Sequence, residues 1–171
     1  MELQANRLTI IPLNLKQFKL LLEGTDKMEE ALNLAHSHES LDAHTYEAMF
    51  GLYKLATAHK EDYYWFTNWQ IILKSQNISI GSACFMGCPN ENGEVELGYG
   101  INEAFRCNGY MTEAVDAMCQ WALAQPNVSC VIAETDKDNT ASHRVLQKCG
   151  FTKYKETEEG YFWHMIEEIH K

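Results

Sequence analysis

The sequence predicts a single α/β domain that spans residues 1–171 and is built on a mixed β-sheet. β-rich runs and segments of helical period follow one another in the order strand, helices, three strands, helix, strand, helix and two strands. Short polar turns favour antiparallel neighbours early in the sheet, whereas a helix between two later strands favours a parallel crossover. The chain has 171 residues, of which 46% are hydrophobic and 22% charged, so it is large enough for one buried core.

The first half of the chain is predicted to supply one strand, several helical segments and a hairpin. Residues 7–13 are β-rich and end near Pro12, and the amphipathic pattern of residues 15–23 predicts a helix. Residues 26–62 have helical tendency, with one segment near residues 27–35 and another near residues 41–59. Two β-rich runs within residues 64–87 flank a polar turn, which predicts a hairpin.

The second half of the chain is predicted to alternate strands with helices. Apolar residues recur at helical spacing over residues 109–124, and Pro126 ends that helix. Gly150 stands where a left-handed cap would end a later helix, and Phe151 can make the apolar contact that closes the cap. The other predicted elements are strands at 93–101 and 128–135, a helix within 138–151, and a C-terminal hairpin over 154–168 that turns near Gly160.

Composition argues against several classes of partner. A formal net charge of −10 disfavours binding to nucleic acid or to an anionic membrane surface. The opening residues have no basic start followed by an apolar core, and no run approaches the roughly 20 apolar residues of a membrane span. We therefore expect a cytoplasmic protein whose cysteines are reduced. Cys84 and Cys88 have no second pair of ligands, so buried free thiols are favoured over a metal site.

The turn that precedes residues 110–124 carries no ordinary capping side chain. Arg106, Asn108 and Gly109 occupy it, without Ser, Thr or Asp at the usual position. The first amides of a helix lack partners within the helix and lie at the positive end of its dipole. Water or an anion must therefore bind them, and Gly109 permits the close backbone approach of a phosphate-binding nest. From this turn alone, a water-capped helix start is an equal alternative.

The strand before this turn contains Gly98 and Gly100, which predict a bulge or a close approach by another group. Glu96 shares their parity within a half-buried segment. Burial there would raise its pKa towards that of a useful general base. The alternative is a solvated glutamate on an open strand face, which fits Glu94 better because Glu94 lies beside a turn.

Two polar residues open the helix predicted within residues 138–151. An Asn at the position of Asn139 is most often a helix cap, and a Ser at the position of Ser142 can bond its own backbone. His143 and Arg144 point in other directions and are expected at the surface.

Taken in order, these motifs resemble the GNAT acyltransferase superfamily. Arg106 and Gly109 match the family's coenzyme turn, Arg/Gln-x-x-Gly-x-Gly/Ala, and Met111 replaces the family's small residue. The opening residues 6–13 and the late Asn139, Ser142, Gly150 and Phe151 resemble the branch that acetylates the N-termini of ribosomal proteins. The resemblance implies a GNAT-like domain with a mixed, largely antiparallel, twisted sheet of about seven strands. Helices would flank this sheet, which would be splayed between its fourth and fifth strands.

The resemblance also implies acetyl-CoA as co-substrate, an amine as acceptor and no metal. Residues 93–152 would form the coenzyme-binding core, and the helical region 26–62 would line the acceptor side. Glu96 would take a proton from the acceptor through water. Ser142 would protonate the departing thiolate, because Leu146 occupies the place of the family's usual tyrosine. The implied coenzyme-binding residues are Tyr99, Ile101, Arg106, Cys107, Asn108, Gly109, Tyr110, Met111 and Asn139.

Several alternatives stay open. The acceptor is either a protein N-terminal amine or a small free amine, and the protein is a monomer or a homodimer. The rival to an enzyme is an acyl-CoA-binding regulatory or sensory module without catalysis, which Leu146 and Met111 favour. A dinucleotide-binding domain fits poorly because the turn lacks a G-x-G-x-x-G run.

Overall fold

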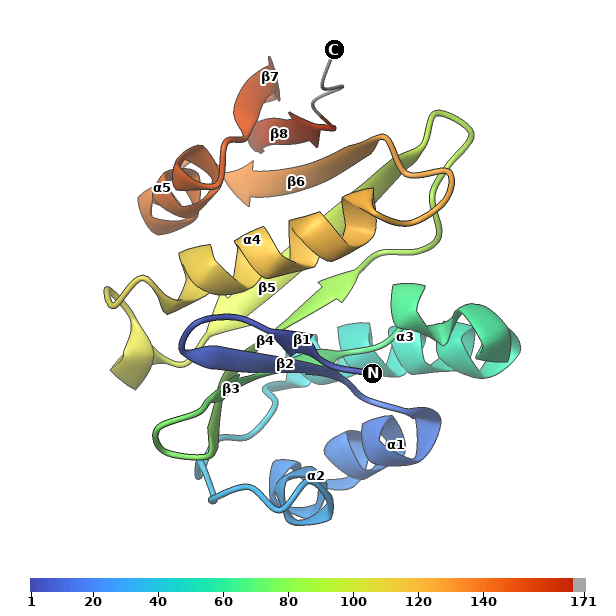
Figure 1. The fold of residues 1–171 in the computed structure, drawn as a ribbon, viewed down its shortest axis with the longest axis vertical. Helices are drawn as coiled ribbons and strands as arrows, with labels where there is room; N and C mark the ends of the chain where they lie inside the picture. Colours follow the sequence, from blue (N-terminus) through green and yellow to red (C-terminus); the bar gives the residue numbers. More distant parts are fainter. Residues whose placement is uncertain (168–171) are drawn as a thin grey trace.

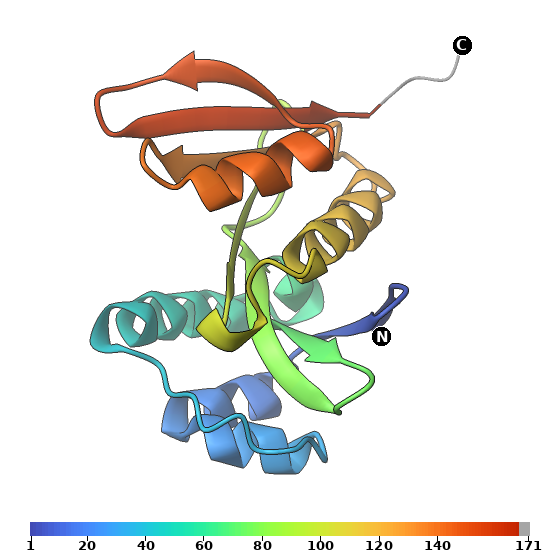
Figure 2. The same cartoon turned by 90° about the vertical axis from the view of Figure 1, so that its left-hand side faces the viewer.

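A computed structural model describes residues 1–167, which form one eight-stranded sheet in the order β1-β2-β3-β4-β5-β6-β8-β7 (Figure 1). Helix α4 covers one face of the sheet, and α1, α2 and α3 lie on the other (Figures 1 and 2). The strands are β1 (Leu3–Gln4), β2 (Leu8–Pro12), β3 (Trp69–Leu73), β4 (Ile78–Phe85), β5 (Glu94–Ile101), β6 (Cys130–Asp136), β7 (Thr152–Glu156) and β8 (Gly160–Ile166). The helices are α1 (Leu15–Glu23), α2 (Thr25–Ala31), α3 (Ala43–Ala58), α4 (Tyr110–Leu123) and α5 (Thr140–Lys148), with short 3₁₀ helices η1 (Lys60–Trp65) and η2 (Glu103–Phe105).

The predicted mixed α/β sheet is confirmed, with one additional strand. The parallel pair is β5 with β6, and every other pair of neighbouring strands is antiparallel. The additional strand is β1, whose two residues pair with Ile10 and Thr9 of β2. A strand of two residues has no alternation to detect, so the sequence pattern does not reveal it.

The region predicted to be helical, residues 26–62, covers most of α2, all of α3 and the start of η1, and a non-helical segment separates α2 from α3. Asn33 and His38 adopt left-handed backbone conformations in that segment, with φ of 55° and 60°. A buried carboxylate holds the segment in place: Glu29, 1% exposed, accepts hydrogen bonds from the Ser37 hydroxyl and from its amide at 3.1 Å. Glu29 therefore ties Ser37 back to α2 and fixes the path of the segment.

Strand β5 changes its partner part of the way along its length. It pairs with β6 through Glu94–Glu96 only, whereas Leu97–Ile101 pair with β4. Strand β6 continues to Asp136 in its pairing with β8, so β5 and β6 separate after Glu96. We call this separation the fork. It confirms the predicted splay, because β5 and β6 are the fourth and fifth of the strands predicted from the sequence.

Of the two alternatives predicted for Gly98 and Gly100, the structure shows a close approach and no bulge. The β4–β5 register runs through this segment without a shift. A Cβ on Gly98 would stand 2.7 Å from the Met86 methyl, whereas a Cβ on Gly100 would meet nothing within 4 Å. The close backbone approach is made by Gly81 of β4, whose Cβ would stand 2.3 Å from the Gly100 carbonyl oxygen. Glycine in a strand indicates either a bulge or a close approach, and the neighbouring strand decides between them.

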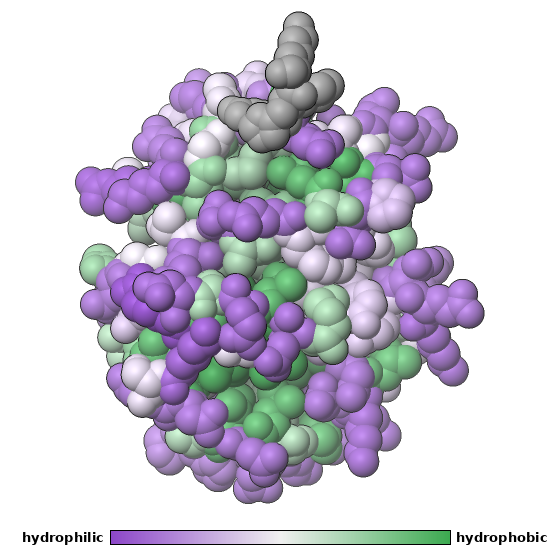
Figure 3. Space-filling model, viewed as in Figure 1, coloured by the Kyte–Doolittle hydropathy of each residue, from purple (hydrophilic) through white to green (hydrophobic). Residues whose placement is uncertain are grey.

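An aromatic cluster anchors α4 to the sheet. The Trp121 ring of α4 lies 4.9 Å from the rings of Trp65 and Trp69 and 5.7 Å from that of Phe85, measured between centroids. Trp69 and Phe85 are fully buried. Large aromatic contacts of this kind dominate the energetics of a core, so they fix the axis of α4 against β3 and β4. On the face of the molecule that carries α4, hydrophilic residues cover much of the surface, with apolar patches between them (Figure 3).

Gly81→Ala is expected to lower the free energy of unfolding by about 1–3 kcal/mol, because the new methyl group would press on the backbone of β5. Its Cβ would stand 2.3 Å from the Gly100 oxygen and 2.9 Å from the Ile101 Cα. Urea denaturation measures the change. Gly100→Ala is the matched control, expected within about 0.5 kcal/mol of the parent protein. Equal stability of the two variants would contradict the close approach.

Candidate active site

The 106–109 turn leads into α4 without a capping side chain, as predicted. Gly109 occupies the cap position in the left-handed conformation, with φ of 78°. Cys107 is also left-handed, with φ of 63°, a conformation that is costly for a residue with a Cβ. Asn108 turns its side chain away from the helix start and donates to the carbonyls of Phe105 at 3.2 Å and Arg106 at 2.9 Å. The amides that open α4 are therefore left for a ligand or for solvent.

The first residues of α4 divide between surface and core. Met111 is 6% exposed and belongs to the hydrophobic core, so its long side chain points away from the turn. Its size therefore does not obstruct the approach of a ligand to the turn. Tyr110 is half-buried and carries the Arg7 guanidinium over its ring, with the guanidinium carbon 4.4 Å from the ring centroid. Arg106 and Cys107 are exposed.

Glu96 lies at the fork, on the last paired residue of β5 before the strand leaves β6. Burial raises the pKa of its carboxyl above the ordinary value, and the Glu134 carboxylate on β6 raises it further. Both features match the environment predicted for Glu96. Glu94 is different, because its carboxylate accepts a hydrogen bond of 2.9 Å from the Asn90 side chain in the adjacent turn. Glu94 is thus bound by its turn, but it is half-buried and not the solvated glutamate that the alternative describes.

The direction of Glu96 follows from the alternation of the strand. Leu97 pairs with Phe85, so both lie on the face that packs against Trp121 of α4. Glu96 has the opposite parity and faces the side of the sheet that carries α1 to α3 (Figure 2). The Cys84 thiol lies on the same side of the sheet. Burial raises its pKa to about 11, and the Glu96 carboxylate contributes to this rise.

Tyr99 of β5 and Ser142 of α5 come together beyond the fork. The Tyr99 hydroxyl is buried and has no hydrogen-bond partner among residues 1–167. Burial raises the pKa of Tyr99 to about 12, and the neighbouring Ser142 hydroxyl opposes part of that rise. Only the backbone of Tyr99 is singled out by the sequence. A tyrosine in a strand reads as a packing residue, and no local pattern connects residue 99 with residue 142.

Asn139 acts as a helix cap, which is one of the two predicted roles. Its side-chain oxygen accepts a hydrogen bond of 3.2 Å from the Ser142 amide. Leu146 lies one helical turn after Ser142 and is fully buried. His143 is half-buried rather than at the surface: its Nε2 lies 2.9 Å from the Asp136 carbonyl oxygen, and its ring packs on Trp163 with centroids 5.6 Å apart. Two aromatic rings of β8 thus cover a histidine that the helical pattern alone places outside.

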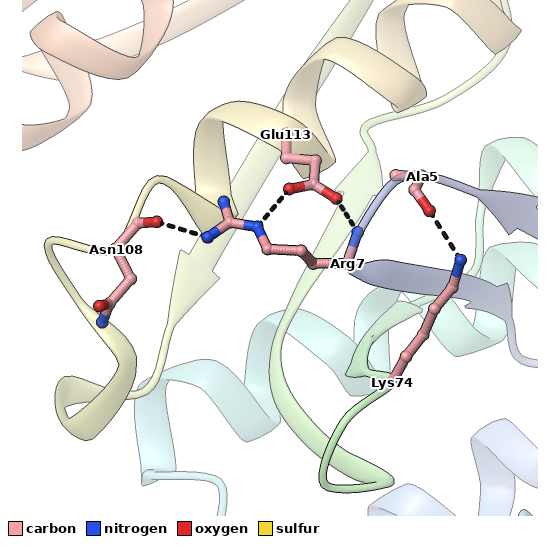
Figure 4. A network of polar contacts seen from close by, with 5 residues as sticks. All are labelled: Ala5, Arg7, Lys74, Asn108 and Glu113. Atoms are coloured by element: carbon pink, nitrogen blue, oxygen red, sulfur yellow. Dashed lines mark hydrogen bonds and ion pairs between the residues drawn. The ribbon is translucent and has the colours of Figure 1, made fainter.

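Arg7 is the functional candidate that no motif singles out. Its Nη1 donates to the Asn108 carbonyl at 3.0 Å, and its Nε donates to the Glu113 carboxylate at 2.9 Å (Figure 4). The start of the chain therefore contacts a turn about one hundred residues later. Local periodicity carries no information about such a contact. The only sequence signal for a role of Arg7 is its position, since this charged residue stands directly before a largely apolar strand.

Several expected absences concern metals and membranes. Within residues 1–167, no group of three or more His, Cys, Asp and Glu side chains is arranged to hold a metal ion. All six cysteines are free thiols, but Cys88 is exposed, contrary to the burial expected for it. No helix in this part of the chain is long and apolar enough to span a bilayer. The cytoplasmic location and the lack of a nucleic-acid partner stay predictions.

A fork beside an uncapped helix start and a half-buried glutamate is the arrangement implied by the GNAT resemblance. Residues 7–152 match the acetyltransferase (GNAT) domain family. The chain therefore belongs to this family, and the suspected resemblance is confirmed. Ile101, which ends β5 opposite Gly81, lies within the matched region together with the other predicted site residues.

Individual relatives agree with this assignment. The uncharacterized N-acetyltransferase YjdG of Bacillus subtilis is 35% identical over 98 residues, which cover 57% of this chain and 58% of that protein. The chain thus matches little more than half the length of this curated relative. A ribosomal-protein-S5-alanine acetyltransferase from Vibrio fischeri superimposes with a TM-score of 0.72 at 17% identity, over 100% of this chain and 99% of that one. RimL, a ribosomal L7/L12 α-N-protein acetyltransferase in complex with coenzyme A, gives 0.69 at 16% identity, over 97% and 98%. At these identities the superpositions establish the fold.

Glu134→Gln is expected to lower the pKa of Glu96 and to leave it above the ordinary glutamate value. The substitution removes the smaller cause of the rise, the neighbouring negative charge, whereas burial remains. Titration of the Glu96 side-chain carbon by NMR measures the change. Glu158→Gln removes an exposed carboxylate in the β7–β8 turn and serves as the control. An unaltered Glu96 titration in Glu134→Gln would contradict the coupling across the fork.

Proposed function

We propose that the protein is an acetyl-CoA-dependent N-acetyltransferase that moves an acetyl group to a primary amine. The observation that carries this proposal is the position of Glu96. This half-buried carboxylate with a raised pKa ends the paired part of β5, at the point where the sheet opens. A general base is most effective when its pKa lies near the working pH, and burial moves Glu96 in that direction. The uncapped start of α4 supplies the second half of a two-substrate site.

The residues present fit the coenzyme. Gly109 has no Cβ and holds a left-handed turn, so the first amides of α4 are accessible to a diphosphate. Beyond the fork, the edge of β5 that faces β6 forms no ladder, so the backbone of Tyr99 and Ile101 can bond to an extended pantetheine arm as an added strand would. Asn139 and Ser142 border this gap from α5. When bound, acetyl-CoA supplies the activated thioester.

The residues of the chain then have separate roles in proton transfer. Glu96, through water, accepts a proton from the acceptor ammonium, so that the neutral amine can attack. The Ser142 hydroxyl donates towards the departing thiolate. A thiol has an ordinary pKa of about 8.5 and leaves readily, so the demand on this donor is small. The buried Leu146 in the tyrosine position is compatible with catalysis for the same reason.

The acceptor is proposed to reach Glu96 from the side of the sheet that carries α3. The carboxylates of Glu96 and Glu134 and the net charge of −10 favour a cationic acceptor. A protein N-terminal amine is our preferred acceptor, with support from two full-length structural neighbours that are named as acetyltransferases of ribosomal proteins. A small free amine is the alternative. A sensory module without catalysis is the second candidate function, favoured by the absence of a tyrosine at position 146.

The protein is expected to release coenzyme A from acetyl-CoA faster than background hydrolysis when a suitable amine or peptide amine is added. A thiol-release assay across a panel of small amines and peptides measures this rate. Glu96→Gln should lower kcat at neutral pH by about 100-fold, with little change in coenzyme affinity. The loss should narrow at alkaline pH, where the acceptor amine loses its proton unaided. Glu94→Gln is the matched control, because Asn90 already binds that carboxylate.

Release at the hydrolysis rate for every acceptor would favour the sensory module. A pH–rate profile of Glu96→Gln that matches the parent protein would exclude Glu96 as the base.

Gly109→Glu is expected to abolish coenzyme binding, because a carboxylate at the turn crowds and repels the diphosphate. Calorimetry with coenzyme A measures the affinity. Gly109→Ala carries the same left-handed backbone strain without the charge and should lose much less affinity. Near-normal affinity in a folded Gly109→Glu protein would remove the 106–109 turn from the coenzyme site.

A further inference from the structure

The side chain of Arg7 is held in one orientation by contacts with the 106–109 turn and α4. Its amide and its Nε donate to the two carboxylate oxygens of Glu113, at 2.5 and 2.9 Å. Its Nη1 donates to the Asn108 carbonyl at 3.0 Å (Figure 4), and its guanidinium covers the Tyr110 ring. The guanidinium is thus held by its Nε bond to Glu113, its Nη1 bond to Asn108 and its contact with the Tyr110 ring, which restrict it more strongly than a single ion pair would.

The backbone around Arg7 is also fixed. The Lys74 amide donates to the Arg7 carbonyl at 3.0 Å, and the Lys74 Nζ donates to the Ala5 carbonyl at 2.7 Å (Figure 4). The turn between β3 and β4 thus supports the loop between β1 and β2. Arg7 is therefore ordered before any ligand binds, and binding would cost little side-chain entropy.

One guanidinium nitrogen remains available at the turn. Nη2 of Arg7 lies 3.4 Å from the place where a Cβ on Gly109 would stand. It makes no hydrogen bond with the residues of the range 1–167, and the Arg7 side chain is 43% exposed. A cationic donor is therefore positioned beside the uncapped amides of α4, where an anion would bind.

Glu113 gives this arrangement an electrostatic purpose. Its carboxylate lies in the first turn of α4 and is only 17% exposed, so solvent screens it weakly. Alone, it would repel a diphosphate at the same helix terminus. Arg7 neutralises Glu113 through Nε and the backbone amide and still presents Nη2 to the turn.

We infer that Arg7 determines coenzyme specificity by neutralising Glu113 and by donating from Nη2 to the diphosphate. The inference rests on the proposed function, since it requires the coenzyme at the 106–109 turn. The site then selects thioesters that carry a diphosphate over simple pantetheine thioesters. Arg7 acts on binding and has no part in proton transfer.

Arg7→Ala tests the inference when its effect is compared across truncated ligands. Calorimetry should show coenzyme A and dephospho-coenzyme A, which both keep the diphosphate, bound about 10- to 100-fold more weakly. In the thiol-release assay, kcat/KM for S-acetylpantetheine, which lacks the diphosphate, should change less than about threefold. An equal loss for all three ligands would mean that Arg7 only supports the fold, and would overturn the inference. A loss confined to intact coenzyme A would assign Arg7 to the 3′-phosphate and would also overturn it.

The double variant Arg7→Ala/Glu113→Gln isolates the electrostatic part. Removing the uncompensated carboxylate should restore about three- to tenfold of the lost coenzyme affinity. A structural role predicts no recovery, because both partners of the ion pair are then missing. Thermal unfolding of the ligand-free variants is the control that checks whether each variant folds.

Coenzyme binding by the parent protein and by Gly109→Glu distinguishes a failure of this inference from a failure of the proposed function. If Gly109→Glu loses coenzyme binding while Arg7→Ala keeps it, only the inference is wrong. If Gly109→Glu binds coenzyme A normally, the coenzyme is not at the turn and both are wrong.

Discussion

The separation of β5 from β6 after Glu96 is the constraint on which the site depends. Within a continuous sheet, each backbone group of β5 would be satisfied by a neighbour on either side. Because β6 pairs with β8 as far as Asp136 while β5 turns to β4, one edge of β5 is left without a ladder partner. The same geometry leaves Glu96 half-buried, between the packed part of the sheet and the gap. A backbone edge for an extended ligand and a carboxylate with a raised pKa thus have a single structural origin.

The orientation of α4 supplies the second requirement, an anion site at a fixed distance from the fork. Trp121 packs among Trp65, Trp69 and Phe85 and so holds the C-terminal end of the helix against β3 and β4. The helix start is held separately by Arg7. These two attachments use different elements of the fold, and together they leave α4 little freedom to pivot. Positioning of this kind is the main contribution that such a site can make to a transfer between two bound substrates.

The sequence predicts the order of elements well, because the signals for these elements are local. The helix over residues 15–23 shows this, since the pattern coincides with α1 and Asn14 caps it as its residue type suggests. The uncapped 106–109 turn and the half-buried Glu96 are also local features, and both are found. The pattern leaves alternatives open where the outcome depends on a distant neighbour. Gly98 and Gly100 are compatible with a bulge or with a close approach, and the space around Gly81 decides between the two.

The candidate site follows the same division. Motif spacing identifies the residues on β5, at the turn and at the start of α5, because each motif lies within a few residues of chain. It does not identify Arg7, which pairs with Glu113 across 106 residues. It also does not reveal that the hydroxyls of Tyr99 and Ser142 are neighbours. Both contacts depend on how strands and helices pack in three dimensions. The sequence pattern gives the order of these elements along the chain but not their positions in space.

The charge distribution explains why the local groups at the turn matter so much. A net charge of −10 attracts a cationic acceptor over long range and repels an anionic coenzyme. Salt screens this field beyond about 8–10 Å, whereas groups in direct contact with a ligand are affected much less. The proposed coenzyme site therefore relies on short-range donors, namely the α4 amides, Arg7 and Arg106. An acidic protein can hold an anion in this way only if each nearby carboxylate is paired, and Glu113 is the one in the first turn of α4. In the site we propose, its pairing with Arg7 is thus a condition for binding the diphosphate and not an incidental surface contact.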